Sequence, residues 1–199
     1  MNKQRWFDDL TIKISHECVK IDEPLSLHTM TKMGGRADLF VSPTSEEEAI
    51  FVVSYAHHNQ IPLLLLGNGS NMVVRDGGVR GIVLNLSKLN CIKINGTRVY
   101  AESGADIIDV SRAAVKETLA GLEFACGIPG SVGGAMAMNA GAYGGEIKDI
   151  IFQATVLTHE GEKLVLSKEE LELDYRMSVI AKKGYYVLSA EFELVPGDQ

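Results

Sequence analysis

The chain has 199 residues, of which 46% are hydrophobic and 23% charged, so it suits one domain or two small ones and is too apolar to stay disordered. Its net charge of −7 argues against nucleic acid or an anionic membrane surface as the main partner, and no apolar run approaches the ~20 residues that cross a bilayer. Three cysteines without a Cys-x-x-Cys spacing, and a start unlike a signal peptide, predict reduced thiols and a cytoplasmic location.

The first half of the chain predicts alternating helices and strands. Apolar residues at helical spacing predict a short amphipathic helix at the N-terminus. Thr44 or Ser45 can cap the next helix, because each is followed three positions on by a glutamate. The all-leucine run at 63–66 predicts a strand covered on both faces. The expected elements are helices at 4–14 and after residue 45, and strands at 37–41, 63–66 and 81–86.

The second half predicts mostly strands. Asn95-Gly96 lies between two short strand-like runs and predicts a hairpin with a type I′ turn, and Ser167 and Glu170 have the spacing of a capping box for one helical turn. The expected elements are strands at 91–94, 98–101, 150–158, 163–166 and 185–195, and a helix at 106–119. We predict an α+β fold in two small lobes, with an N-terminal helical segment at 1–22, a first lobe at 23–89 and a second lobe at 90–199.

A glycine-rich loop directly follows the predicted strand at 63–66. It reads Gly67-Asn68-Gly69-Ser70-Asn71-Met72. Glycines let successive amides turn inward around a phosphate, and short polar side chains add donors. The alternative is a tight turn between two strands. Met72 stands where a Rossmann fingerprint requires a third glycine, so a pyrophosphate bound here would lie in a different fold.

A second glycine-rich segment lies further along, since eight of the 20 glycines fall within residues 121–145. They alternate with Ile, Pro, Val, Ala and Met, which argues against a flexible linker. The part that reads Pro129-Gly130-Ser131-Val132-Gly133-Gly134-Ala135 would let a flat ligand or another backbone approach closely. A helix junction packed through glycines is the alternative.

Charged and nucleophilic residues give fewer signals. Arg176 after Asp174-Tyr175 fits a surface charge, but a Tyr–Arg pair facing a cleft would clamp a carboxylate. His57 and His58 end a predicted helix and complement its dipole, and the other histidines are isolated, so we expect no metal site. No Ser/His/Asp or Cys/His order suggests a covalent nucleophile.

Together these motifs resemble the UDP-N-acetylenolpyruvoylglucosamine reductase family, also called UDP-N-acetylmuramate dehydrogenase. The resemblance covers almost the whole chain, and the motifs occur in the family's order. The segment that begins at His28 and reads His-Thr-Met-Thr-Lys-Met-Gly-Gly-Arg-Ala is similar to the family's entry segment, although the family usually has Asn at its first position. The four motifs are Leu66-Gly67-Asn68-Gly69-Ser70-Asn71, Gly127-Ile128-Pro129-Gly130-Ser131-Val132-Gly133-Gly134, Asn139-Ala140-Gly141-Ala142-Tyr143-Gly144 and Tyr175-Arg176.

The resemblance implies tightly bound FAD, held between two lobes of the vanillyl-alcohol-oxidase (PCMH) type of flavoprotein fold. NADPH would be the co-substrate, and a hydride would reach the enolpyruvyl ether of a UDP-sugar in the synthesis of a cell-wall peptidoglycan precursor. FMN has a single phosphate and would occupy only half of the phosphate-binding loop at 67–72, so FAD is the expected flavin. Gly69→Val should abolish flavin retention with little loss of fold. The implied cofactor-binding residues are Gly67, Asn68, Gly69, Ser70, Asn71, Met72, Pro129, Gly130, Gly133, Gly134, Ala135, Asn139 and Gly141.

By the same resemblance Arg176 is the catalytic residue that stabilises the developing enolate, and Tyr175 lies beside it at the substrate. The family also uses a proton-donating serine and a glutamate on a third, substrate-binding domain, and neither Ser178 nor Ser189 lies in the matching motif. We therefore expect these 199 residues to be the FAD-binding part, inactive alone, with a C-terminal domain as the missing partner that completes the site. The alternatives are an FAD-binding module or subunit of another oxidoreductase of this fold, and a scaffold without a ligand.

Overall fold

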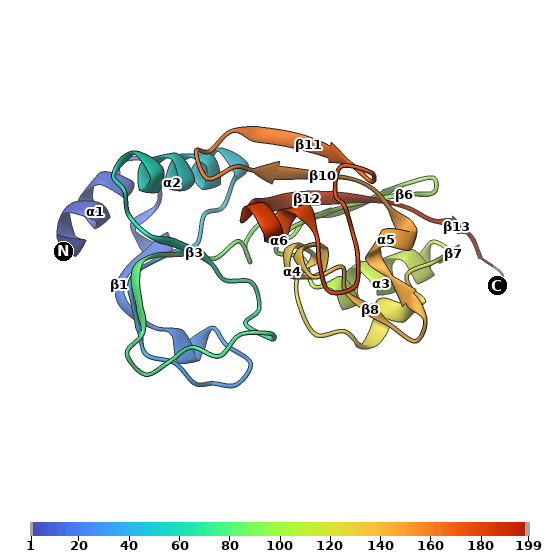
Figure 1. The fold of residues 1–199 in the computed structure, drawn as a ribbon, viewed down its shortest axis with the longest axis horizontal. Coiled ribbons are helices and arrows are strands. Elements are labelled where there is room, and N and C mark those ends of the chain that lie inside the picture. The colour runs from blue at the N-terminus through green and yellow to red at the C-terminus, as the bar shows by residue number, and fades with distance from the viewer. Residues whose placement is uncertain (1, 198–199) are drawn as a thin grey trace. The chain divides into compact units, whose positions relative to one another are not determined.

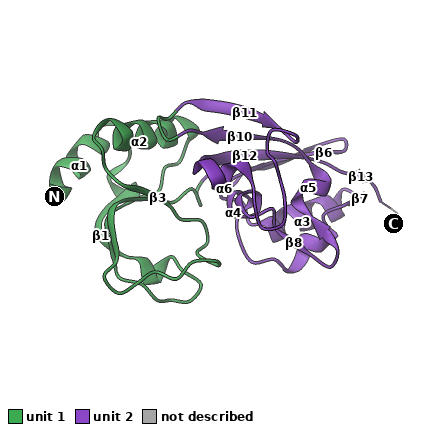
Figure 2. Ribbon diagram, viewed as in Figure 1, with its two compact units in different colours: residues 1–88, 159–161 green, residues 89–158, 162–199 purple. Residues whose placement is uncertain are grey.

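The computed structural model describes residues 2–197. It consists of two compact units, one formed by residues 1–88 with 159–161 and the other by residues 89–158 with 162–199 (Figure 2). Residues 1–22, expected as a separate helical segment, fall within unit 1. Each unit has its own β-sheet (Figure 1).

Unit 1 is built on a four-stranded mixed sheet with the order β1-β2-β4-β3, in which only the β1–β2 pair is antiparallel. The central strand β2 is buried at all but its first position, which explains its apolar sequence. Ser45 caps α2 by accepting a hydrogen bond from Glu48 N at 3.2 Å, so the predicted cap is confirmed. The elements are α1 (Lys3–Leu10), η1 (His16–Cys18), β1 (Val19–Pro24), η2 (Leu25–Leu27), β2 (Arg36–Val41), α2 (Glu46–His58), β3 (Leu63–Leu65) and β4 (Val79–Leu84).

The predicted strand at 63–66 forms, but its burial differs from the prediction. It is β3, and all three of its residues are half-buried. The reason is its place in the sheet, because β3 pairs with β4 on one side only and is therefore an edge strand. Leu66, just beyond the strand, is the residue of this run that is fully buried.

Unit 2 is built on a five-stranded sheet, order β11-β10-β12-β6-β5, in which every neighbouring pair is antiparallel. Its core joins side chains of β6, β10 and β12 to those of α3 and α4. The elements are β5 (Ile92–Asn95), β6 (Arg98–Glu102), α3 (Ile107–Lys116), β7 (Leu119–Ala120), η3 (Glu123–Gly127), α4 (Val132–Ala137), β8 (Gly141–Ala142), β9 (Gly145–Glu146), α5 (Ile147–Ile150), β10 (Ile151–Leu157), β11 (Lys163–Ser167), α6 (Val179–Lys183), β12 (Tyr186–Glu193) and β13 (Val195–Pro196).

Two local predictions in unit 2 need correction. The hairpin β5–β6 forms, but Asn95 pairs with Arg98, so its turn residues are Gly96 and Thr97. Only Gly96 has a positive φ (+58°), which is the pattern of a type II′ turn rather than type I′. Ser167 and Glu170 do exchange the two hydrogen bonds of a capping box, at 2.9 and 3.3 Å, but the residues after Ser167 form a turn and no helix.

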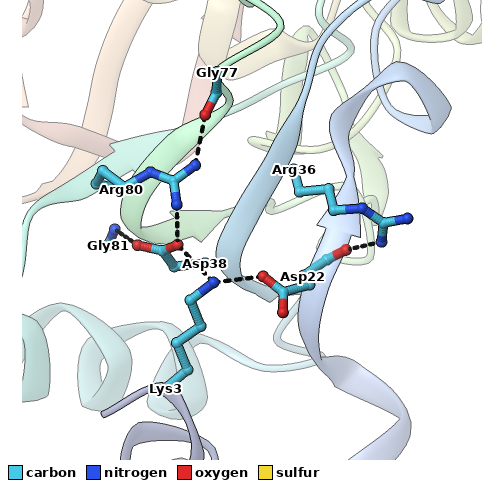
Figure 3. Close-up of polar contacts among 7 residues, drawn as sticks. All are labelled: Lys3, Asp22, Arg36, Asp38, Gly77, Arg80 and Gly81. Atoms are coloured by element: carbon cyan, nitrogen blue, oxygen red, sulfur yellow. Dashed lines mark hydrogen bonds and ion pairs between the residues drawn. The ribbon is translucent and has the colours of Figure 1, made fainter. Parts of the chain in front are cut away.

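A buried carboxylate joins α1, β2 and β4 in unit 1. Asp38 is 1% exposed, and it accepts hydrogen bonds from Arg80 (2.7 Å) and Gly81 N (3.0 Å), while Lys3 Nζ lies 2.9 Å away (Figure 3). Burial by itself would raise the pKa of Asp38. The hydrogen bonds and charges of its three neighbours outweigh burial and hold that pKa below its ordinary value. The ionised form of Asp38 therefore stabilises the fold.

Asp38→Asn is expected to destabilise the protein by about 2–3 kcal/mol near neutral pH, because Lys3 and Arg80 lose their buried counter-charge. Since the folded-state pKa of Asp38 is lowered, its stabilisation is present above the ordinary Asp pKa and is lost as the pH falls through the folded-state value. Urea unfolding should therefore show wild type and variant converging in acid. Asp22→Asn, which changes a carboxylate 49% exposed, is the control and should cost less than about 0.5 kcal/mol. Equal stability of Asp38→Asn and wild type at neutral pH would contradict this.

Candidate functional site

The loop that follows β3 directs its carbonyl groups toward the protein. The side-chain amide of Asn85 donates to Leu66 O (2.8 Å) and Gly67 O (3.2 Å), and Met30 N donates to Gly69 O (3.3 Å). No sequence pattern had singled out Asn85, which is buried just after β4. Its signal in the sequence is a polar residue directly at the end of an apolar strand.

The amides of the same loop remain available. Among residues 2–197, no protein group accepts a hydrogen bond from the backbone N–H of Gly67, Gly69, Ser70 or Asn71. Ser70 and Asn71 are also exposed. A run of amides without protein acceptors is what an anion such as a diphosphate requires. The geometry therefore fits the role predicted for residues 67–72, which stays a prediction.

Gly69 is required by the protein itself. Its φ is +62°, and a Cβ at this position would lie 2.7 Å from both His28 O and Thr29 Cα. Any side chain would therefore push the loop away from residues 28–29, whether or not a ligand is bound. The expectation that Gly69→Val spares the fold is wrong, and loss of flavin from that variant would not prove a direct contact.

In unit 2 the second glycine-rich segment packs against the residues between β6 and α3. Gly133 N donates to Ser103 O at 2.9 Å, and a Cβ on Gly133 would lie 2.2 Å from Ser103 Oγ. Gly134 differs, because it is exposed and its Cβ would meet only Ser131 Oγ, at 3.6 Å. Pro129 is exposed too. The predicted residues thus divide into Gly133 and Ala135, which are buried, and Pro129 and Gly134, which a ligand can reach.

Asn139 and Gly141 have structural partners. The side chain of Asn139 is 2% exposed and hydrogen-bonded to three other residues, which are described below. A Cβ on Gly141 would lie 2.7 Å from Gly145 O, because the two residues belong to the paired strands β8 and β9. The cofactor-binding role predicted for both residues stays a prediction, and for the Asn139 side chain the protein contacts leave it no free donor.

Tyr175 and Arg176 occupy the tip of a tight turn. Asp174 and Met177 exchange two backbone hydrogen bonds of 3.0 Å, and Arg176 has a positive φ of +53°. Tyr175 is 81% exposed, and its ring centroid is 6.0 Å from the guanidinium carbon of Arg176. No carboxylate among the described residues pairs with Arg176. The pair that the sequence singled out is therefore presented together, and its guanidinium is available to an anion.

Residues 2–197 contain neither a metal-binding group of side chains nor a membrane-spanning helix. No group of three or more His, Cys, Asp or Glu side chains there is arranged to hold a metal ion. In the same residues, none of the helices has the length and apolar character needed to cross a membrane.

The sequence matches the model of a family described as FAD binding domain over residues 37–167. The chain belongs to that family. The FAD cofactor that the sequence predicted is thereby confirmed. The loop of unit 1 also fits FAD, because the amides of Gly67 and of residues 69–71 suit its diphosphate.

Curated relatives of this FAD-binding domain are named UDP-N-acetylenolpyruvoylglucosamine reductase. The one from Exiguobacterium sibiricum is 58% identical over 185 residues, which are 93% of this chain and 61% of that protein. The one from Staphylococcus saprophyticus is 51% identical over 199 residues, which are 100% of this chain and 65% of that protein. The chain therefore spans about three fifths of the length of the curated relatives it matches.

Solved structures share the fold. The UDP-N-acetylenolpyruvylglucosamine reductase of Thermus caldophilus has a TM-score of 0.76 at 29% identity, over 90% of this chain and 62% of that one. An alkyldihydroxyacetonephosphate synthase and the 4-ethylphenol oxidase of Gulosibacter chungangensis both have a TM-score of 0.72, at 17% and 19% identity. Each covers 97% of this chain, and the matched parts are 40% and 42% of those proteins. The predicted α+β FAD-binding fold is confirmed.

Proposed function

We propose that the chain is the FAD-binding part of a UDP-N-acetylenolpyruvoylglucosamine reductase. The reaction would reduce UDP-N-acetylglucosamine enolpyruvate to UDP-N-acetylmuramate with NADPH, in peptidoglycan synthesis. The observation that carries this proposal is the exposed Tyr175–Arg176 tip with its unpaired guanidinium, in a chain whose relatives of that name are 51–58% identical. The alternative, an FAD-binding module of another oxidoreductase, is compatible with the FAD-binding family and with the fold shared by structures that are 17% and 19% identical.

In this proposal the residues of the chain have separate tasks. Bound FAD supplies the two-electron hydride chemistry. The amides of Gly67 and of residues 69–71 hold its diphosphate, and Gly134 leaves space against α4. Arg176 donates hydrogen bonds to the substrate carboxylate and stabilises the negative charge that develops on the enolate, an electrostatic contribution to the transition state. Tyr175 presents an aromatic face and a hydroxyl beside it. The proton donor is assigned to no residue of this chain.

Gly134→Ala tests the wall of the cofactor site. The new methyl group has space in the protein alone, and alanine favours a helix, so the FAD-free variant should be as stable as wild type or more stable by up to about 0.5–1 kcal/mol. If the flavin packs against Gly134, FAD affinity should nevertheless fall about tenfold in a fluorescence titration. Gly77→Ala is the control, since a Cβ there meets nothing within 4 Å. Unchanged FAD affinity of Gly134→Ala would remove this residue from the site.

The ligand itself gives a second test. Denaturing release and chromatography of the chromophore from the purified protein should yield FAD and not FMN, because the amides of Gly67 and of residues 69–71 are more than one phosphate uses. Recovery of FMN alone would contradict the assignment of this loop to a diphosphate.

The proposed activity is tested by completing the chain. Fusion to the part of the Exiguobacterium relative that this chain does not match should give NADPH oxidation that depends on the enolpyruvyl UDP-sugar. NADPH oxidation that ignores this substrate would favour the alternative oxidoreductase. We also propose a cytoplasmic location, which the three free cysteines and the use of NADPH support.

A further inference from the structure

Two exposed turns of unit 2 meet at one buried side chain. The hairpin β8–β9 begins two residues after Asn139 and ends at Glu146. It carries Tyr143, whose side chain is 92% exposed. The turn at 174–177 carries Tyr175 and Arg176. The side-chain amide of Asn139 donates to Glu146 Oε2 (2.8 Å) at the base of the hairpin and to Asp174 O (3.1 Å) at the base of the turn.

This asparagine is fixed from its other side as well. Lys148 N donates to Asn139 Oδ1 at 2.9 Å, so both side-chain donors and the side-chain acceptor are engaged inside the protein. Its φ of +40° lies in the left-handed region, which Asn tolerates better than most residues. The side chain therefore connects three chain segments and offers no free donor to a ligand.

The turn at 174–177 is anchored at its second end by Ser178. The hydroxyl of Ser178 is fully buried, donates to Ala137 O at 2.7 Å and accepts from Ala181 N at 3.1 Å. Residues 137–139 at the end of α4 thus hold the segment both before and after the Tyr175–Arg176 tip. On the side of Asp174, the side chain of Asn139 donates to the carbonyl that also closes the turn with Met177 N, and three residues earlier Leu171 O accepts from Val179 N at 2.9 Å.

We propose that Asn139 is a positioning residue for Arg176 and does not bind FAD through its side chain. The catalytic role of Arg176 in this inference rests on the proposed function. The way in which Arg176 is held rests on the hydrogen bonds of Asn139 and Ser178 described above. Without the Asn139 amide, the tip keeps the Ser178 anchor and the hydrogen bond from Val179 N to Leu171 O (2.9 Å) at the base of the segment, but it loses its contact at Asp174 O, so the guanidinium samples more orientations. Misplacement of a catalytic group by about 1 Å can lower the reaction rate about 10²-fold. Affinity for FAD should be unchanged, because the Asn139 side chain makes no contact with FAD in this proposal.

Asn139→Gly is the primary test, because glycine adopts the positive φ without strain and removes only the side-chain contacts. In the 199-residue chain, hydrogen exchange of the Met177 amide should become at least about tenfold faster, and the FAD dissociation constant should stay within about twofold. In the completed chain, kcat should fall about 10–100-fold with the KM for NADPH unchanged.

Asn139→Asp covers the case in which the glycine variant folds poorly. It keeps the shape and the acceptor for Lys148 N, but it places a carboxylate against Glu146 and the Asp174 carbonyl, so its effect on exchange and kcat should exceed that of glycine. Glu146→Gln is the matched control, since its amide oxygen still accepts from Asn139, and exchange at Met177 should stay within about twofold of wild type.

Hydrogen exchange of the Met177 amide as slow as in wild type, in both Asn139 variants, would overturn the proposal. A tenfold loss of FAD affinity in Asn139→Gly would overturn it too. These two measurements need no substrate. If the completed wild-type chain reduces no enolpyruvyl UDP-sugar, the proposed function fails, and exchange and FAD affinity still decide what Asn139 does.

Discussion

A polypeptide of these 199 residues should bind FAD and yet reduce the enolpyruvyl UDP-sugar at least about 10²-fold more slowly than the completed chain. Hydride addition creates negative charge that must be protonated at the neighbouring carbon, and a general acid contributes about 10²–10⁴-fold. The hydroxyls of Ser131 and Ser178 are held by the protein, since Ser131 is 3% exposed and caps α4 and Ser178 is fully buried with two hydrogen bonds.

The measurement compares substrate-dependent NADPH oxidation at equal FAD content. The flavin absorption of the two proteins serves as the control for cofactor loading. Robust reduction by the 199 residues alone would place the proton donor within them. Tyr175 would then be the first residue to test, because its hydroxyl belongs to a side chain that is 81% exposed beside Arg176. A loss of activity in Tyr175→Phe would identify it.

Arg176→Ala in the completed chain should lower kcat by about 10²–10³-fold, which is the usual cost of removing one preorganised donor to a developing oxyanion. Flavin content should be unaffected, because alanine is smaller than arginine and adopts the same positive φ that Arg176 already has. Arg176→Lys should recover only part of the rate, since an ammonium cannot bind a carboxylate in the bidentate manner.

The control for Arg176→Ala is Arg112→Ala. Arg112 is also exposed, but it pairs with Asp109 on α3, so its loss should leave kcat within about twofold. A completed Arg176→Ala chain with near-normal kcat would show that the guanidinium does not act in the transition state. A raised KM for the UDP-sugar with kcat unchanged would instead assign Arg176 to ground-state binding.

The sequence by itself predicted what depends on neighbours a few residues away. The cap at Ser45 and the reciprocal hydrogen bonds of Ser167 and Glu170 formed as predicted, since each partner lies three residues on. The FAD-binding family could be predicted for a related reason. Several short motifs in a fixed order identified it without any knowledge of how those motifs pack.

The tertiary structure decided which small and polar residues are enclosed by other parts of the protein and which lie open. Glycines 69, 133 and 134 are alike in sequence, but backbone at residues 28–29 fills the space beside the first, Ser103 fills the space beside the second, and the third lies open. Asn139 lies in a motif predicted to bind the cofactor, but its side-chain amide donates a hydrogen bond to the carbonyl of Asp174, 35 residues away. The lowered pKa of Asp38 likewise depends on Lys3 and Gly81 and on Arg80, which is 42 residues away. Such contacts form between segments remote in the chain, and a local pattern carries no information about which remote segment arrives there.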